Sequence, residues 1–328
     1  MTEGKDRPAG AAGADIMIDI EGVTKRYGES AVVDDVSLRV AKGTITVIVG
    51  TSGSGKSTLM RMINRLVPIS GGRISVGGRD IMSVPATDLR RGIGYAIQGH
   101  GLFPHRTVAQ NIATVPQLLG WEQARLDRRV DELLTLFNLD PKSFAAKYPH
   151  ELSGGQQQRV GVARALAAEP EVLLMDEPFV ALDPVIRGKA QDDLLAIQQQ
   201  FGTTIILVTH DMDEAFHLGD QIAVMSGGRL LQCSTPEDIL TAPADPFVQQ
   251  LTGTSDRALK LMSLAALKER MEPARAGLAH SLSQDLNLRD ALAEMIWRGI
   301  DEAAVEDGAH QAVGSISIHR LIALGRHA

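Results

Sequence analysis

The chain has 328 residues, of which 44% are hydrophobic, so it is long enough to fold into one sizeable domain and a smaller one. Its formal net charge of −7 argues against the broad basic surface of a protein that binds nucleic acid irrespective of sequence. There is no run of about eighteen apolar residues that would cross a membrane, and the single cysteine permits no intrachain disulfide and fits a reducing cytoplasm.

The N-terminal stretch is predicted to be a tail followed by a pair of strands. Residues 1–14 are rich in alanine and glycine and lack the apolar middle of a secretory signal, so we expect them to be disordered. Apolar and polar residues then alternate in 16–20 and again in 36–40, which predicts antiparallel strands. Tyr27 lies at their edge, where its ring either stacks on a nucleotide base or is an ordinary half-buried tyrosine.

A glycine-rich segment between a strand-like run (44–49) and a helical pattern (from 59) is the Walker A phosphate loop in its required context. Its glycines allow successive backbone N–H groups to converge on a phosphate, and the following helix directs its positive end at the same anion. The lysine then reaches the β- and γ-phosphates, and the serine after it can ligate Mg²⁺. The residues expected to bind nucleotide here are Gly50, Thr51, Ser52, Gly53, Ser54, Gly55, Lys56, Ser57 and Thr58.

The next stretch combines one strand with a helical region. A strand over 95–98 ends in Gln98, and the pattern from about residue 100 to 168 is helical, with an apolar face that includes Leu126 and Val130. The segment Leu152-Ser153-Gly154-Gly155-Gln156 then precedes a further helix. Ser153 has the chemistry of an N-cap, and the same helix end could bind an anion.

Two buried strands end in residues suited to phosphate chemistry. The continuous apolar run 172–175 is typical of a strand covered on both faces, and it ends in Asp176 and Glu177, the Walker B position. There, Asp176 would hold Mg²⁺ and Glu177 would polarise the attacking water. A second run, 204–209, ends in His210, for which a γ-phosphate contact is favoured over a purely structural role. The alternation of strands and helices predicts an α/β core with a parallel sheet.

Taken together, these motifs resemble the ATP-binding subunits of ATP-binding-cassette (ABC) transporters, over about residues 15–252. The resemblance implies a phosphate-loop core of the RecA-like type, with an antiparallel β subdomain and a helical subdomain at about 100–168. It assigns Tyr27 to adenine stacking, Gln98 to the Q-loop and to Mg²⁺, and His210 to the switch position. It also makes Ser153, Gly154, Gly155 and Gln156 the signature motif and places Asp183 in the D-loop.

The resemblance further implies a head-to-tail homodimer that closes on two ATP molecules. Each ATP would lie between the phosphate loop of one copy and the signature motif of the other. Lys56, Gln98, Glu177 and His210 would then carry catalysis, with ATP and Mg²⁺ bound. Hydrolysis to ADP and phosphate would open the dimer again.

The residues around several of these motifs are similar to those of importers of quaternary amines such as glycine betaine, choline or proline betaine. The similar segments include 61–66, 101–105 and 177–184. This implies two membrane-spanning permease subunits, a periplasmic or lipoprotein substrate-binding protein, and a peripheral location on the cytoplasmic face of the inner membrane. The alternatives are an importer of another small solute, such as an amino acid or polyamine, and a soluble cassette ATPase. Val180 departs from the family pattern, where glycine is usual.

The C-terminal part, 257–328, is predicted to be a small separate α+β module. A helix beginning near Asn287, strands at 304–308 and 313–317, and a final helix through Leu321 are similar to one CBS (cystathionine-β-synthase-like) unit. Arg320 stands where that motif usually has a ribose-binding aspartate. We therefore expect either a degenerate regulatory or dimerising module or an inert docking tail.

Overall fold

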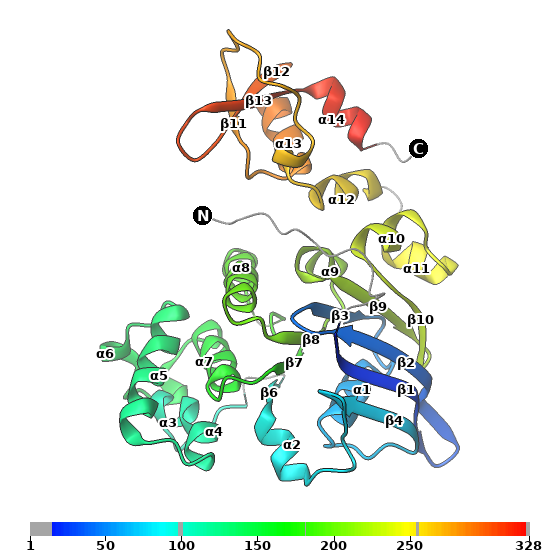
Figure 1. Ribbon diagram of the computed structural model, residues 1–328, viewed down its shortest axis with the longest axis vertical. Helices are drawn as coiled ribbons and strands as arrows, with labels where there is room; N and C mark the ends of the chain where they lie inside the picture. The colour runs from blue at the N-terminus through cyan, green and yellow to red at the C-terminus, as the bar shows by residue number, and fades with distance from the viewer. Residues whose placement is uncertain (1–14, 98–100, 181, 254–255, 326–328) are drawn as a thin grey trace. The chain divides into compact units, whose positions relative to one another are not determined.

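The computed structural model describes residues 15–97, 101–180, 182–253 and 256–325. The described residues up to Cys233 form one compact unit and those from Ser234 onward form a second (Figure 1). The helices α10 (Pro236–Thr241) and α11 (Pro246–Leu251) thus fall in the second unit, whereas the boundary expected from the sequence lies after residue 252. The predicted tail, 1–14, lies outside the described residues.

A six-stranded sheet forms the centre of the first unit, in the order β10-β9-β3-β8-β7-β6. The five strands from β9 to β6 are parallel, as the strand-helix alternation predicts. Three of them are buried along their whole length, which explains their continuous apolar runs. The strands are β3 (Ile45–Val49), β6 (Ile93–Ala96), β7 (Val172–Asp176), β8 (Thr204–Val208), β9 (Gln221–Ser226) and β10 (Arg229–Ser234).

A second, antiparallel sheet has the order β2-β1-β4-β5. The predicted pairing of its first two strands is confirmed, with Ile20 opposite Leu38. Alternate side chains of these strands point into the core, which explains the period of two in the sequence. The strands are β1 (Ile16–Tyr27), β2 (Ser30–Ala41), β4 (Gly71–Val76) and β5 (Arg79–Asp80).

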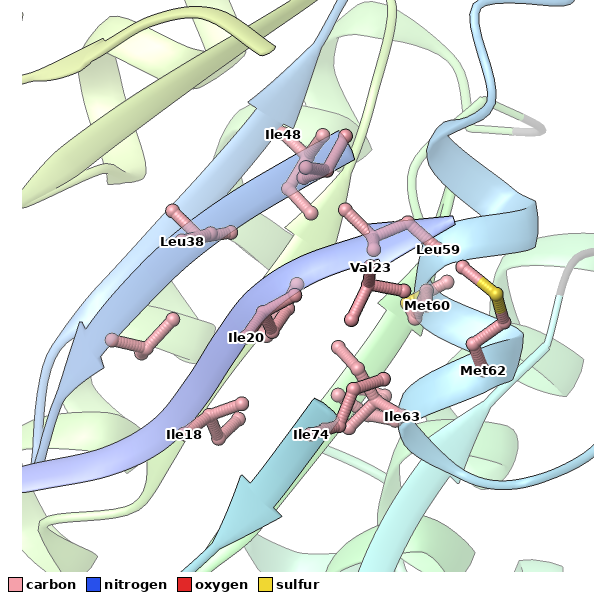
Figure 2. Close-up of a cluster of buried hydrophobic side chains, with 14 of the residues drawn as sticks. Ile18, Ile20, Val23, Leu38, Ile48, Leu59, Met60, Met62, Ile63 and Ile74 are labelled. Carbon is pink, nitrogen blue, oxygen red and sulfur yellow. The ribbon is translucent and has the colours of Figure 1, made fainter. Parts of the chain in front are cut away.

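Helix α1 (Lys56–Ile63) packs against the inner face of this antiparallel sheet. Figure 2 shows Leu59 and Ile63 of the helix close to Val23 and Ile74 of the strands, and all four side chains are fully buried. Burial of each such side chain contributes about 1.5–3 kcal/mol to folding. This packing fixes the helix, and therefore the phosphate loop that leads into it.

The remaining helices of the first unit cover the central sheet or form the predicted helical region. In α5, the apolar face that includes Leu126 and Val130 is buried, as predicted. Within the described residues, helices extend from 108 to 166, whereas 101–107 form a loop. The helices are α2 (Ala86–Gly92), α3 (Val108–Ile112), α4 (Thr114–Leu118), α5 (Gln123–Leu136), α6 (Pro141–Phe144), the 3-10 helix η1 (Pro149–Glu151), α7 (Gly154–Leu166), α8 (Pro184–Phe201) and α9 (Met212–Leu218).

The second unit has its own core and a three-stranded sheet, β11-β12-β13. The helix predicted near Asn287, the two strands and the last helix are all present, and the Asn287 side chain caps that first helix. A short additional strand, β11, pairs parallel with β12. Besides α10 and α11, the elements are α12 (Arg257–Ser263), the 3-10 helix η2 (Leu267–Glu269), β11 (Ser281–Ser283), α13 (Leu288–Arg298), β12 (Glu302–Glu306), β13 (Ala312–Ser317) and α14 (Ile318–Leu324). Across the described part of the chain, no helix is both long and apolar enough to cross a bilayer.

Candidate functional site

The glycine-rich loop between β3 and α1 has a backbone that only glycine can adopt at two positions. Gly50 has φ 150°, and a Cβ there would lie 2.0 Å from the Met225 carbonyl oxygen. Gly55 has φ 97°, and a Cβ there would lie 2.5 Å from the Val32 carbonyl oxygen. The loop is therefore pressed against neighbouring backbone on both sides, while Thr51, Ser52 and Gly53 face solvent.

The side chain of Lys56 folds back over this loop. Its Nζ donates hydrogen bonds to the carbonyl oxygens of Gly50 (2.8 Å) and Thr51 (2.9 Å). Burial lowers the pKa of Lys56, and the carboxylates of Glu177 and Asp176 oppose that effect. The ammonium therefore lies against the backbone of the loop, in the position from which a lysine can contact a bound phosphate.

Asp176 and Ser57 meet beside the loop, at the ends of β7 and the start of α1. The Ser57 hydroxyl donates to Oδ1 of Asp176 at 2.9 Å, and Nη2 of Arg61 lies 3.7 Å from Oδ2. Asp176 is only 2% exposed, and this burial raises its pKa, against the lowering effects of Ser57 and Arg61.

This oxygen pair fits Mg²⁺, which takes hard oxygen ligands and usually keeps waters and phosphate oxygens in its shell. Within the described ranges, no group of three or more histidine, cysteine, aspartate or glutamate side chains could hold a metal ion. A cation bound by Ser57 and Asp176 would thus depend on phosphate and water for its other ligands. Gln98, the third predicted ligand, lies outside the described residues.

Glu177, the first residue after β7, adopts a left-handed backbone conformation with φ 48°. Its N–H donates to the Val208 carbonyl oxygen at 2.9 Å, which extends the pairing of β7 with β8 by one residue. Its Oε1 lies 3.4 Å from Nδ1 of His210, so the predicted base and the predicted switch histidine share one sheet edge. For a residue other than glycine, this backbone conformation costs about 1–2 kcal/mol. Strained conformations of this kind cluster at functional sites.

The predicted signature motif forms the N-terminus of α7, a helix of 13 residues. Ser153 caps it: its Oγ accepts from the Gln156 N–H at 3.3 Å, and Oε1 of Gln156 accepts from the Ser153 N–H at 2.9 Å. Ser153 and Gly154 are exposed, and a Cβ on Gly154 would meet no atom within 4 Å. The capping function of Ser153 is confirmed, and its contact with a nucleotide bound by a second copy stays a prediction.

Tyr27 ends β1 with 55% of its surface exposed. The ammonium of Lys25 lies 4.8 Å from the ring centroid and donates to the Pro68 carbonyl oxygen at 2.8 Å. A cation thus holds the ring by a cation–π contact, while the ring stays accessible for stacking. Lys25 is not among the residues expected from the sequence, although residues two apart on a strand share a face.

Asp183, predicted in the D-loop, caps α8 by accepting from the Ile186 N–H at 3.1 Å. Its neighbour Ala181 lies outside the described residues. Thr58 is half-buried in the first turn of α1, and Gly155 lies beside Leu182, where a Cβ would be 3.3 Å from Cδ2. The start of α7 therefore packs directly against the residues that precede α8.

Another residue that the sequence analysis missed is Asn111, which is fully buried in α3. Its amide binds the carbonyl oxygens of Phe103, Arg106 and Thr107, and its Oδ1 accepts from the Phe103 N–H at 2.8 Å. It therefore shapes the loop 101–107. A polar residue on a short apolar helix is the only sequence signal of this function.

Known proteins that resemble this chain in sequence are ATP-binding proteins of transport systems. The family model described as ABC transporter matches residues 33–180. The glycine betaine uptake system ATP-binding protein YehX of Escherichia coli is 47% identical over 306 residues, 93% of this chain and 99% of that protein. The choline transport ATP-binding protein OpuBA of Bacillus subtilis is 42% identical over 92% of this chain and 78% of its own length.

Solved structures agree on the fold. A dimeric ATP-binding cassette in a post-hydrolysis state, bound to ADP and Pi, matches with a TM-score of 0.61 and 31% identity. The match covers 67% of this chain and 98% of that one.

Proposed function

The chain belongs to the ATP-binding proteins of ABC transporters, and we propose that it hydrolyses ATP to drive import of a quaternary amine such as glycine betaine or choline. The observation that supports this substrate class best is the 47% identity to the glycine betaine uptake protein over 99% of that relative's length. The described site has the chemistry that the reaction needs, because a phosphate loop, a buried aspartate and a glutamate–histidine pair follow three adjacent strands.

In the proposed mechanism, the loop N–H groups and Lys56 bind the β- and γ-phosphates of ATP, while Tyr27 stacks on the adenine. Ser57 and Asp176, with Gln98, would hold Mg²⁺, which when bound offsets negative charge on the phosphate oxygens. Glu177 accepts a proton from the attacking water, and His210 keeps the carboxylate and the γ-phosphate in place. The bond between the β-phosphate oxygen and the γ-phosphorus breaks, which leaves ADP and phosphate.

A second copy would complete each site. The exposed N-terminus of α7 is a helix end whose first N–H groups have no carbonyl partner within the helix, and the γ-phosphate of an ATP held by the other copy can bind there. Ser153, Gly154, Gly155 and Gln156 would supply this contact, and Asp183 would lie near the dimer axis. The dimeric state of a related cassette supports a homodimer here.

Import also needs partners that cross the membrane. We propose two permease subunits, with this protein bound peripherally at the cytoplasmic face of the inner membrane and a substrate-binding protein on the other side. ATP favours the closed homodimer and ADP the open one, and the bound permease follows this shift in population.

A direct test is uptake of radiolabelled glycine betaine and choline in a strain that lacks its own uptake systems, complemented with this protein and its permease. We expect uptake to require ATP-competent protein and to be absent with the Glu177→Gln variant. Uptake of an amino acid or polyamine instead would assign the alternative substrate class. If the protein does not copurify with any permease, the soluble cassette ATPase becomes the better interpretation.

For the C-terminal unit, we propose a regulatory or dimerising function of the CBS-like kind. The arrangement of a strand, a helix, two strands and a helix from β11 to α14 supports this proposal, as does a core that is independent of the first unit. Arg320 donates its backbone N–H to the Ser317 side chain at the start of α14.

A further inference from the structure

The helices α8 and α9 are joined by two polar pairs that lie one turn apart on α8. Nη1 of Arg187 is 3.6 Å from Oδ2 of Asp211. Nε2 of Gln191 donates to Oε1 of Glu214 at 3.2 Å, and both of these side chains are buried. The pairs fix the start of α9 against the first half of α8.

Arg187 makes a second contact, with a residue that precedes it in the chain. Its Nη2 donates to the carbonyl oxygen of Leu182 at 3.1 Å. Leu182 lies in the segment that precedes α8, together with Asp183, which caps that helix. One guanidinium therefore bridges the segment before α8 and the segment before α9, which are separate stretches of the chain.

Asp211, the partner of Arg187, is itself held in a defined position. Its Oδ1 accepts from the N–H groups of Asp213 (2.9 Å) and Glu214 (3.3 Å), so the carboxylate caps α9 while its other oxygen faces Arg187. Asp211 directly follows His210 in the chain, and the His210 ring lies 3.4 Å from the Glu177 carboxylate. Displacing Asp211 would therefore displace the histidine.

We propose that Arg187 is a positioning residue that couples the segment at Leu182 and Asp183 to the segment that carries His210. The inference rests on the proposed ATP hydrolysis. Arg187 contacts a carbonyl oxygen and a carboxylate outside the phosphate loop, so its loss should misplace His210 and Glu177 without weakening the loop that binds ATP. In a closed homodimer, the same bridge would link the histidine of one site to the segment before α8 that faces the second copy.

The test compares Arg187→Met with Lys189→Met in the purified full-length protein. Lys189 is exposed on the same helix, so its replacement by methionine removes the same positive charge from α8 without touching the bridge. We expect Arg187→Met to lower kcat about tenfold with KM for ATP within about twofold of wild type, and Lys189→Met to change neither by more than about twofold. Equal kcat values for the two variants, or a rise in KM with unchanged kcat, would overturn the proposal.

A double-mutant cycle tests the bridge itself. Asp211→Asn keeps the capping oxygen but removes the charge that faces Arg187. If the two residues act through each other, the Arg187→Met/Asp211→Asn protein loses no more kcat than the worse single variant. Additive losses would show that Arg187 acts elsewhere.

Arg187→Lys covers the case in which Arg187→Met does not fold. A lysine keeps the charge but cannot reach two acceptors with a planar fork, so we expect an intermediate loss of about threefold in kcat. Wild-type activity of this variant would contradict the bridge. Failure of the proposed function is distinguishable, because then the wild-type protein would not hydrolyse ATP in the same assay.

Discussion

Nδ1 of His210 lies 3.4 Å from Oε1 of Glu177, although the two residues are 33 positions apart in the chain. The parallel register that places Asp176 opposite Val208 brings them together, because each follows the carboxyl end of its strand. A carboxylate beside an imidazole can both accept a proton and be held in orientation while it does so. The pair therefore has the chemistry that the proposed hydrolytic step requires at this edge of the sheet.

Replacing Glu177 by glutamine should separate ATP binding from hydrolysis. The amide keeps the size and backbone preference of the side chain but cannot accept the proton of the attacking water. We expect kcat to fall by about a hundredfold or more, while the Kd for ATP stays within a few fold of wild type. Steady-state phosphate-release assays measure kcat, and equilibrium titration with ATP measures the Kd.

The same variant should accumulate as a dimer with ATP and Mg²⁺, since the closed state is no longer emptied by hydrolysis. Brisk turnover in Glu177→Gln would remove Glu177 from the role of base. A protein that stays monomeric would argue against the homodimer.

Ser153→Ala tests whether the start of α7 binds a phosphate or is only a helix cap. Loss of the cap alone costs about 1 kcal/mol of stability. Thr107→Ala is a matched control, because Thr107 forms the same kind of capping box with Gln110 at the start of α3. We expect similar small losses of thermal stability in both variants, but a fall in kcat of about tenfold or more only for Ser153→Ala. Equal ATPase rates would leave Ser153 as a cap.

Tyr27→Ala should weaken ATP binding without slowing the chemical step. Stacking of an aromatic ring on a base contributes about 1–3 kcal/mol, so KM for ATP should rise about tenfold while kcat changes little. Tyr27→Phe keeps the ring and should restore wild-type KM. An unchanged KM in Tyr27→Ala would identify the ring as an ordinary surface tyrosine.

Glu214→Gln should change how stability depends on pH. Burial raises the pKa of Glu214 above its ordinary 4.5, although hydrogen bonds with Thr209 and Gln191 oppose the shift. The folded protein therefore holds this proton more tightly than the unfolded chain, and the resulting stability, fully present below pH 4.5, is lost as the pH rises through the raised value. The neutral glutamine avoids this loss.

We accordingly expect Glu214→Gln to melt at a higher temperature than wild type near neutral pH, with the difference shrinking as the pH falls toward the ordinary pKa of glutamate. Glu29→Gln makes the same substitution at an exposed glutamate and is the control. Melting curves across that pH range decide the matter, and a difference that stays constant with pH would contradict the assignment to Glu214.

Disrupting the C-terminal core should alter the salt response of transport but leave the basal ATPase intact. Met295 is fully buried there, so Met295→Asp places an unpaired carboxylate in the core and should unfold this part of the chain at full length. A protein truncated after Ser263 also lacks this core, but it keeps α12, which packs on α10. If transport by both proteins responds to ionic strength as wild type does, the regulatory proposal is wrong and a docking tail is left.

Much of the fold is predictable because local signals and burial agree along the strands. The runs that become β7 and β8 are apolar throughout and are buried on both faces, and the alternation in β1 and β2 matches a sheet with one buried face. The phosphate loop could be located because the chemistry of phosphate binding constrains a short contiguous segment. The edge shared by Asp176, Glu177 and His210 follows from the same reasoning.

The parts that could not be predicted depend on contacts between distant segments. Nothing near Arg187 in the sequence indicates that it binds both Leu182 and Asp211, and the left-handed backbone of Glu177 has no signature in a glutamate. Strand β11 has only three residues, of which two are serines, so its pairing with β12 is set by tertiary structure rather than by propensity.

The backbone conformation at residue 177 also bears on how this protein can be made more robust. Glycine or asparagine would relax the chain at that point, yet the position carries a glutamate, as expected if its side chain serves the proposed chemistry. If Glu177 is the proposed base, a substitution there that raises thermal stability will also abolish turnover. Libraries screened for thermostability alone should therefore hold this codon fixed.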